Sequence, residues 1–272
     1  MKITDWDDAY ANRDHIAGAD GFIERWPQEA AAFRDRLRAE GRARLDLSYG
    51  EGPRQAWDLF LPAGAAQGLV VFVHGGYWRA FDKSVWSHFA AGPLERGWAV
   101  ALPGYTLAPE VAIRDIVAEV GRAVRAAAAE VPGPIRLSGH SAGGHLVTRL
   151  ICRDGALPAD VLGRIEHVLS ISGVHDLRPL LNTAMNADFG LDAAAAAADS
   201  PALLEPVEGA RVTAWVGAAE RPEFVRQTTL LANIWTGLGA DMSQVIEPGR
   251  HHFDVIDGLL APRSDMVNTL LG

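Results

Sequence analysis

The sequence has little cysteine and no long hydrophobic run. Among its 272 residues Cys152 is the one cysteine, so the chain cannot form an internal disulfide. This usage suits a reducing compartment, and we interpret Cys152 as a buried structural thiol. No apolar run approaches the ~20 residues of a membrane span, and the acidic start lacks the apolar region of a signal peptide. These absences favour a cytoplasmic protein with no membrane contact.

Positive charge is also in the minority. The chain has 25 Lys and Arg against 34 Asp and Glu, which gives a formal net charge of −9 with no basic stripe. Such a surface favours solubility and argues against binding to nucleic acid or to an anionic membrane. The His and carboxylate residues show no metal-ligand spacing such as His-Glu-x-x-His. We therefore expect no metal and no other cofactor.

Composition and pattern predict one domain. Hydrophobic residues make up 49% of the chain and charged residues 22%, which is ordinary for one large α/β domain with a generous core. No internal repeat or long linker is evident. We predict a single domain over residues 1–272, with a helical extension at 1–40 in which Pro27 lies in a first helical turn. An alanine-rich insertion at 177–201 is either a lid or a helical connection, and we favour the lid.

The order of the predicted elements indicates a mostly parallel sheet. Two stretches of alternating polarity, 44–49 and 55–61, flank a Gly-Glu-Gly-Pro turn and predict an antiparallel hairpin. Residues 69–73 form a continuous apolar run, typical of a strand buried on both faces. Strands and helices then alternate, and we expect them at 98–103, 113–131, 135–150, 167–172, 211–216, 224–235 and 242–246. This alternation means a parallel sheet with helices on both faces.

The stretch around Ser141 has the pattern of a nucleophile elbow. An apolar strand precedes the Gly-His-Ser-Ala-Gly turn at 139–143, and a helix runs on through Leu150. In such an elbow the serine sits on a strained strand-to-helix turn, and glycines two places on either side let neighbouring elements pack closely. The helix aims its amides and positive dipole end at an oxyanion formed there. Ser141 is therefore the candidate nucleophile.

A hydroxyl nucleophile needs a base, and the base needs a carboxylate to orient it. In open α/β sheets ligands bind at the carboxyl ends of the strands. Glu220 and Asp176 each follow a predicted strand, and His251 and His252 follow the last one. Asp176 has three readings: the acid, a substrate ligand, or a cap on the next segment. The order serine, acid, histidine is that of α/β-hydrolases, and we predict the triad Ser141, Glu220 and His252.

Residues 74–78, His-Gly-Gly-Tyr-Trp, carry a more particular signature. They resemble the His-Gly-Gly-x-Trp motif of the α/β-hydrolase type of kynurenine formamidase (arylformamidase). The similarity covers most of the chain and extends through residues 10–13, 105–110, 139–144, 172–180, 222–227 and 252–253. The resemblance and the element order together predict an α/β-hydrolase fold. Where the family usually has Asp before its Pro-Glu-Phe segment, this chain has Glu220.

The resemblance also implies roles for particular residues. The backbone amides of Gly76, Tyr77 and Ala142 would form the oxyanion hole. The His-Phe pairing of the family is what favours His252 over His251 as the base. Tyr77, Trp78 and Asp176 are the candidate substrate-binding residues, although aromatic side chains near a sheet edge are as often part of the core.

The activity implied by the resemblance is cleavage of a small aryl formamide, such as N-formyl-kynurenine, to formate and the amine through an acyl-enzyme. A carboxylesterase with the same triad is the alternative, since the triad does not distinguish esters from amides. A non-catalytic binding protein on the same fold is a third and weaker reading. The expected partner is a small-molecule substrate, and a homodimer is one option for the assembly.

Overall fold

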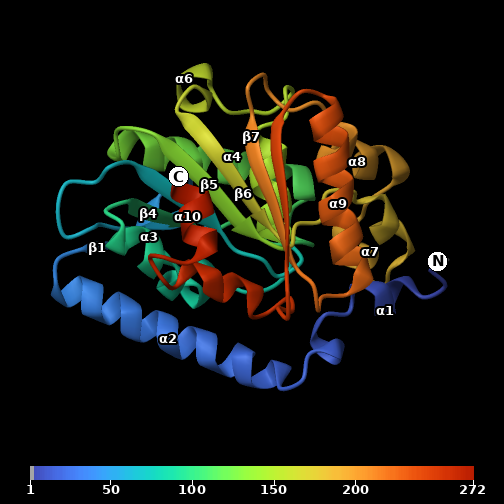
Figure 1. Cartoon of the computed structure of the whole chain (residues 1–272), viewed down its shortest axis with the longest axis horizontal. Helices are drawn as coiled ribbons and strands as arrows, with labels where there is room; N and C mark the ends of the chain where they lie inside the picture. The colour runs from blue at the N-terminus through green and yellow to red at the C-terminus, as the bar shows by residue number, and fades with distance from the viewer. Residues whose placement is uncertain (1–2) are drawn as a thin grey trace.

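An eight-stranded sheet forms the centre of the protein (Figure 1). The structure is a computed structural model that describes residues 3–272; the first two residues of the predicted extension lie outside that range. The strand order is β1-β2-β4-β3-β5-β6-β7-β8. β1 (Ala43–Ser48) and β2 (Ala56–Phe60) form the predicted antiparallel hairpin, β2 also pairs antiparallel with β4 (Ala99–Pro103), and the other neighbours are parallel. The predicted fold class is confirmed.

The remaining elements lie close to their predicted places. The other strands are β3 (Leu69–Val73), β5 (Ile135–His140), β6 (Ile165–Ile171), β7 (Arg211–Gly217) and β8 (Asp241–Glu247). The longer helices are α2 (Ala19–Ala39), α4 (Ile113–Glu130), α5 (Ala142–Leu150), α9 (Pro222–Gly237) and α10 (Asp265–Leu271). Shorter helical segments are α1 (Trp6–Tyr10), η1 (Arg13–His15), η2 (Lys83–Val85), η3 (Ser87–Ala90), α3 (Ala91–Glu95), α6 (Ala159–Leu162), η4 (Arg178–Asn182), α7 (Asn186–Phe189), α8 (Ala193–Ala198), η5 (Pro201–Leu203) and η6 (Val255–Leu259).

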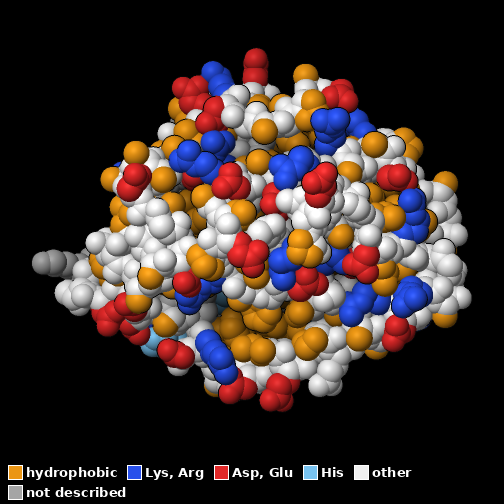
Figure 2. Space-filling view, turned by 180° about the vertical axis from the view of Figure 1, so that it is seen from behind, with side chains coloured by type: hydrophobic (Ala, Val, Ile, Leu, Met, Phe, Trp, Pro, Cys, Tyr) orange, Lys and Arg blue, Asp and Glu red, His pale blue; other side chains and the backbone are white. Residues whose placement is uncertain are grey.

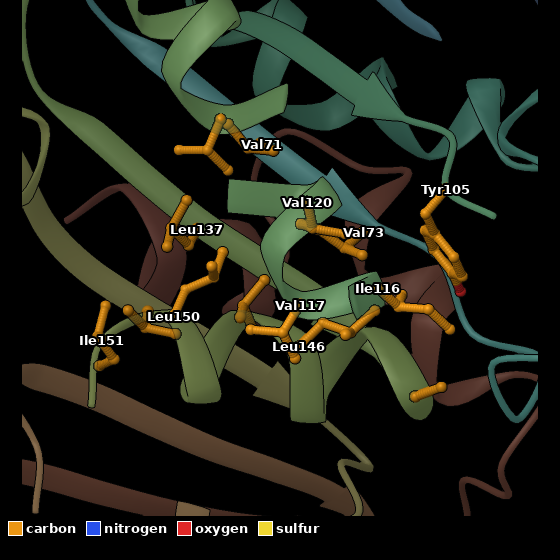
Figure 3. Packing of buried hydrophobic residues seen from close by; sticks show 14 of the residues in the cluster. Val71, Val73, Tyr105, Ile116, Val117, Val120, Leu137, Leu146, Leu150 and Ile151 are labelled. Atoms are coloured by element: carbon orange, nitrogen blue, oxygen red, sulfur yellow. The ribbon is translucent and has the colours of Figure 1, made fainter. Parts of the chain in front are cut away.

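Helices cover both faces of the sheet and create two cores. Because side chains alternate along a strand, Val71 and Val73 of β3 pack on one face, while Val70 and Phe72 pack on the other. Figure 3 shows the first core, where valines of β3 lie near apolar side chains of α4 and α5. The second core lies under α2, α3 and α10. Burial of both faces fixes the strands, and therefore the loops at their carboxyl ends.

No helix within residues 3–272 is both long and apolar enough to cross a membrane.

The start of α2 differs from its prediction. α2 begins at Ala19, so Pro27 lies inside the helix and its predicted place in a first turn is wrong. Gly18 makes the turn into the helix with φ of 72°, a backbone conformation that favours glycine. The apolar face from Trp26 to Leu37 is buried, and this packing outweighs the one backbone hydrogen bond that a proline removes. In Figure 1, α2 runs along the molecule below the sheet, and α1, in the segment before it, lies beside α9.

Several histidines are buried in these cores, among them His88 and His167. Burial disfavours the charged imidazolium and lowers the pKa of each of these two side chains to about 4. In the unfolded chain histidine has a pKa of about 6.5. The unfolded state therefore takes up protons first as the pH falls. The stabilisation by neutral, buried histidine is fully present above about pH 6.5 and is lost toward pH 4.

We expect His88→Phe to flatten the acid side of the stability profile. Neither ring nitrogen of His88 makes a hydrogen bond within the described chain, and Nε2 lies 3.5 Å from Glu29 Oε2, a contact that becomes an ion pair only if the ring is protonated. The ring lies 4.1 Å from that of Phe89, centroid to centroid. Each pH unit below 6.5 removes about 1.4 kcal/mol for one such group. Urea unfolding at pH 7 and pH 5 should therefore show a stability loss about 2 kcal/mol smaller in the variant than in the wild type. Parallel pH profiles would contradict this assignment.

Candidate active site

Ser141 lies between β5 and α5 in a strained backbone conformation. Its φ is 56° and its ψ is −117°, a region that side-chain-bearing residues rarely adopt and that functional sites hold through their surroundings. The flanking glycines make those surroundings possible. A Cβ on Gly139 would lie 2.2 Å from the carbonyl oxygen of Gly143, and a Cβ on Gly143 would lie 2.0 Å from that of Val73. The strand, serine and helix thus form the sharp turn that the sequence predicts.

His252 and Glu220 form a buried pair. His252 Nδ1 lies 2.6 Å from Glu220 Oε2, and both side chains are almost fully buried. The other oxygen, Oε1, accepts hydrogen bonds from Ser172 Oγ at 2.5 Å and from the amide of Gly217 at 2.9 Å. A carboxylate at Nδ1 holds the proton on that nitrogen and leaves Nε2 free to act as a base. The loops after β6, β7 and β8 together build this pair.

The alternatives left open by the sequence have other partners. His251 Nδ1 accepts hydrogen bonds from the amides of Phe253 and Asp254, at 3.1 and 3.2 Å, so this ring caps the turn after β8. Asp176 binds Arg178 through both oxygens, each at 2.9 Å. Its Oδ1 also accepts from the Arg178 amide at 3.1 Å, which is the local turn contact typical of aspartate. The structure therefore brings Glu220, and not Asp176, to a histidine.

Ser141 and His252 both line a cavity of about 390 Å³. Within residues 3–272, neither Ser141 Oγ nor His252 Nε2 makes a hydrogen bond, so both are available to a ligand. Much of the wall is apolar or aromatic, contributed by Ala11, Ile23, Trp26, Ala80, Phe81, Trp86, Met185 and Phe253. The face seen in Figure 2 shows a hollow of this character, with hydrophobic side chains inside and charged side chains near its edge. This size and lining suit a small aromatic molecule.

The amides assigned to the oxyanion hole lie around the serine. Gly76 and Tyr77 line the cavity, with φ of 112° and 49°, and Ala142 begins α5 directly after Ser141. A Cβ on Gly75 would lie 2.9 Å from Ser141 Cβ, so the loop passes beside the serine. None of the three amides donates a hydrogen bond within the part of the chain described. Unpaired donors in this position can bind an oxygen that carries a negative charge.

Trp78 and Asp176 do not line this cavity. The indole of Trp78 is fully buried and meets the rings of His145 and Phe189 edge-on, with centroids 5.1 and 5.7 Å away. It belongs to the core, which is the other reading that the sequence allowed. Of the three predicted substrate-binding residues, Tyr77 is the one at the cavity.

The N-terminal segment forms a wall of the cavity that the sequence analysis does not foresee. Residues 10–14 line it. Three hydrogen bonds hold Tyr10 in place: its hydroxyl donates to Glu223 Oε1 at 2.8 Å and accepts from Gln227 Nε2 at 2.8 Å, and its carbonyl accepts from the Tyr77 hydroxyl at 2.6 Å. Two stretches that share the family resemblance thus contact each other. The presence of both stretches, residues 10–13 and 222–227, in the family resemblance was the sequence signal that could have revealed this contact.

The segment 177–201 contributes Met185 to the cavity wall. Its apolar residues Leu180, Phe189, Leu191 and Ala196 are buried in the first core. A lid function for this segment stays a prediction. Among residues 3–272, no group of three or more His, Cys, Asp or Glu side chains is placed to hold a metal ion.

The fold and the site define a class of protein. The profile of the Alpha/beta hydrolase family matches residues 70–268, so the chain belongs to that family of hydrolases. Kynurenine formamidase of Drosophila melanogaster is 31% identical over 238 residues, which cover 81% of this chain and 78% of the relative. That of Danio rerio is 29% identical over 236 residues, which cover 83% and 80%. Within the α/β hydrolases the chain is a member of the kynurenine formamidase family, which confirms the resemblance seen in the sequence.

A solved structure extends the comparison. The crystal structure of a candidate thioesterase from Silicibacter sp. TM1040 superposes with a TM-score of 0.94, and the two chains are 51% identical. The match covers 98% of this chain and 99% of the other. The whole fold, including the N-terminal segment, is therefore shared with that protein.

Gly76→Ala should impair the enzyme severely. With φ of 112°, Gly76 holds a conformation that alanine resists, and its new Cβ would lie 2.4 Å from the carbonyl oxygen of Ala80. The loop must then shift and displace the Gly76 amide. If that amide is an oxyanion donor, its loss should lower kcat by about 10²- to 10³-fold. Gly76→Pro should be at least as harmful, because proline has no N–H at all and cannot adopt this φ.

The matched control for Gly76→Ala is Tyr77→Phe. It removes the hydroxyl that donates to the Tyr10 carbonyl but keeps the Tyr77 amide. We expect kcat within about threefold of the wild type and a stability loss of about 1 kcal/mol. Circular dichroism and thermal unfolding check the fold of both variants. A folded Gly76→Ala protein with wild-type kcat would place the oxyanion hole elsewhere.

Proposed function

We propose that the protein is a serine hydrolase in which Ser141 is the nucleophile, His252 the base and then the acid, and Glu220 the residue that orients the imidazole. The observation that carries this proposal is the Glu220–His252 contact of 2.6 Å at the cavity that Ser141 also lines, on its strained turn. The proposal assigns a residue to each role that acyl transfer to a hydroxyl requires.

In the proposed mechanism His252 Nε2 takes the proton of Ser141 Oγ as the oxygen attacks the carbonyl carbon. The carbonyl oxygen becomes negative and accepts hydrogen bonds from the three unpaired backbone amides. Protonated His252 then donates its proton to the leaving nitrogen, the C–N bond breaks, and the amine departs. Water activated by the same histidine attacks the acyl-serine, and Ser141 regains its proton as the acid product leaves.

The proposed substrate is a small aryl formamide such as N-formyl-kynurenine, which gives formate and the free amine. Two observations support it. Two sequence relatives that match most of the chain are named kynurenine formamidase. The cavity joins Ser141 to a wall that contains Trp26, Phe81 and Trp86, and such a wall suits an aryl ring next to a small acyl group.

An esterase or thioesterase that uses the same residues is the second candidate. An observation that favours it is that the structural relative with 51% identity is described as a candidate thioesterase. Esters and thioesters react with serine nucleophiles more readily than amides do, and the triad itself accepts all three. A non-catalytic binding protein is disfavoured, because binding alone requires neither the strained serine nor the buried acid–histidine pair.

The decisive comparison is kcat/KM for N-formyl-kynurenine against a short nitrophenyl ester and a short thioester. We expect the formamide to be preferred by at least about tenfold, because the enzyme must bind its transition state more tightly to offset the lower reactivity of the amide. A preference for the ester or thioester contradicts the formamide proposal and leaves the serine mechanism in place.

A further inference from the structure

The charged residues of the cavity are gathered at its rim. Ser141 and two tryptophans of the wall are buried, whereas the charged lining residues are all exposed to solvent. They are two cations and two anions: Arg13, Arg79, Asp7 and Asp14. The cavity is thus apolar near the nucleophile and carries both signs of charge at its mouth. A rim of this kind suits a ligand that is itself a zwitterion at one end.

Arg79 has a free edge for a carboxylate. Its Nη1 is paired with Asp188 of α7, and its Nε and Nη2 donate no hydrogen bond to any of residues 3–272. These two groups lie side by side in the planar guanidinium and can bind both oxygens of one carboxylate. In Arg13 the same edge is occupied, because Nε and Nη2 both bind Asp20 Oδ1, at 2.9 and 2.7 Å.

Two carboxylates at the rim have no cationic partner within the described residues. Asp14 makes no side-chain hydrogen bond or ion pair there, and the one side-chain hydrogen bond of Asp7 comes from the amide of Ala184 at 2.7 Å. Asp188 fixes Arg79 from the side of Nη1. The rim therefore presents an anchored cation and unpaired carboxylates to whatever enters the cavity.

Building on the proposed function, we propose that this rim selects aryl formamides that carry a zwitterionic amino-acid group. Arg79 binds the α-carboxylate through Nε and Nη2, and Asp14 attracts the α-ammonium group. The aryl ring lies against the apolar wall, and the formamide reaches Ser141. Arg79 and Asp14 are specificity residues and take no part in bond breaking.

The test compares N-formyl-kynurenine with 2-formamidoacetophenone, which keeps the aryl ketone and the formamide but lacks the amino-acid group. The wild type should prefer N-formyl-kynurenine by about 30-fold or more in kcat/KM, and Arg79→Met should reduce that preference about tenfold through KM rather than kcat. Arg79→Lys keeps the charge without the planar edge and should restore only part of the preference for N-formyl-kynurenine. Arg13→Met, the matched control with an occupied edge, should change the preference less than about twofold.

A third substrate separates the two charges. The analogue of N-formyl-kynurenine without its α-amino group keeps the carboxylate. Its KM should rise about tenfold in Arg79→Met, as for the full substrate. Asp14→Asn should raise KM for N-formyl-kynurenine but not for this analogue, because the analogue offers no ammonium group. Equal effects of Asp14→Asn on both substrates would remove Asp14 from the assignment.

The outcomes distinguish this inference from the proposed function. Hydrolysis of both formamides at similar rates, or equal harm from Arg13→Met and Arg79→Met, overturns the rim assignment and leaves the proposed function standing. If neither formamide is hydrolysed, the proposed function fails, and inhibition of nitrophenyl-ester hydrolysis tests the rim alone. Kynurenine should then inhibit the wild type more strongly than 2-aminoacetophenone does, and Arg79→Met should abolish the difference. If kynurenine and 2-aminoacetophenone inhibit the wild type equally, the rim assignment is overturned.

Discussion

Ser141→Ala is expected to lower kcat by about 10³-fold or more while the protein keeps its fold. The oxyanion donors and the cavity remain, so the variant still binds substrate, but no atom is left to attack the carbonyl carbon. Folding is spared because Ser141 Oγ makes no hydrogen bond to any described residue, and alanine meets the same φ of 56°. Steady-state kinetics and thermal unfolding of the purified variant check both expectations.

Ser141→Gly provides the control for this experiment. Glycine adopts positive φ without strain, so this variant should be as stable as the wild type or more stable, and equally inactive. If Ser141→Ala or Ser141→Gly retained a kcat near that of the wild type, the nucleophile would be a different group.

Glu220→Gln is expected to lower kcat by about 10⁴-fold, as the loss of a triad carboxylate does in other hydrolases. One oxygen of Glu220 accepts from Ser172 Oγ and the Gly217 amide, and the other meets His252 Nδ1. If the glutamine oxygen keeps the first two contacts, its NH₂ group faces His252 Nδ1. The imidazole must then carry its proton on Nε2, where it cannot accept the proton of Ser141.

Two amide substitutions serve as controls for Glu220→Gln. Asp176→Asn weakens a pair with the exposed Arg178, and Glu223→Gln weakens a contact of Tyr10 in the cavity wall. Each should lower kcat by less than about tenfold, because neither carboxylate touches His252. If Asp176→Asn abolished activity and Glu220→Gln remained active, the acid would belong to the loop after β6.

The sequence predicts the sheet well because local pattern and tertiary packing agree there. The run at 69–73 is apolar without interruption, and in the structure its side chains pack alternately into the two cores. The Gly-x-Ser-x-Gly spacing is equally informative, since Gly139 and Gly143 stand where any side chain would collide with backbone. In both stretches the signal comes from residues close together in the chain.

The N-terminal wall could not be predicted in the same way. Tyr10 binds Glu223, a residue 213 positions away, and no local periodicity encodes such a contact. Glu223 alone is adequately explained as an acid in the first turn of α9. Trp78 shows a related difficulty: its place in the motif does not reveal whether the indole enters the cavity or the core. The packing of His145 and Phe189 against it decides that question.

Labelling with a serine-directed phosphonate, followed by peptide mapping, tests the central claim most directly. The claim is that Ser141, activated by the Glu220–His252 pair, carries the acyl group during hydrolysis. We predict one phosphonate per chain, located on Ser141, with formamide hydrolysis lost in proportion to the label and no labelling of Ser141→Ala. Modification of another residue, or full labelling of Ser141 with activity intact, would contradict the mechanism.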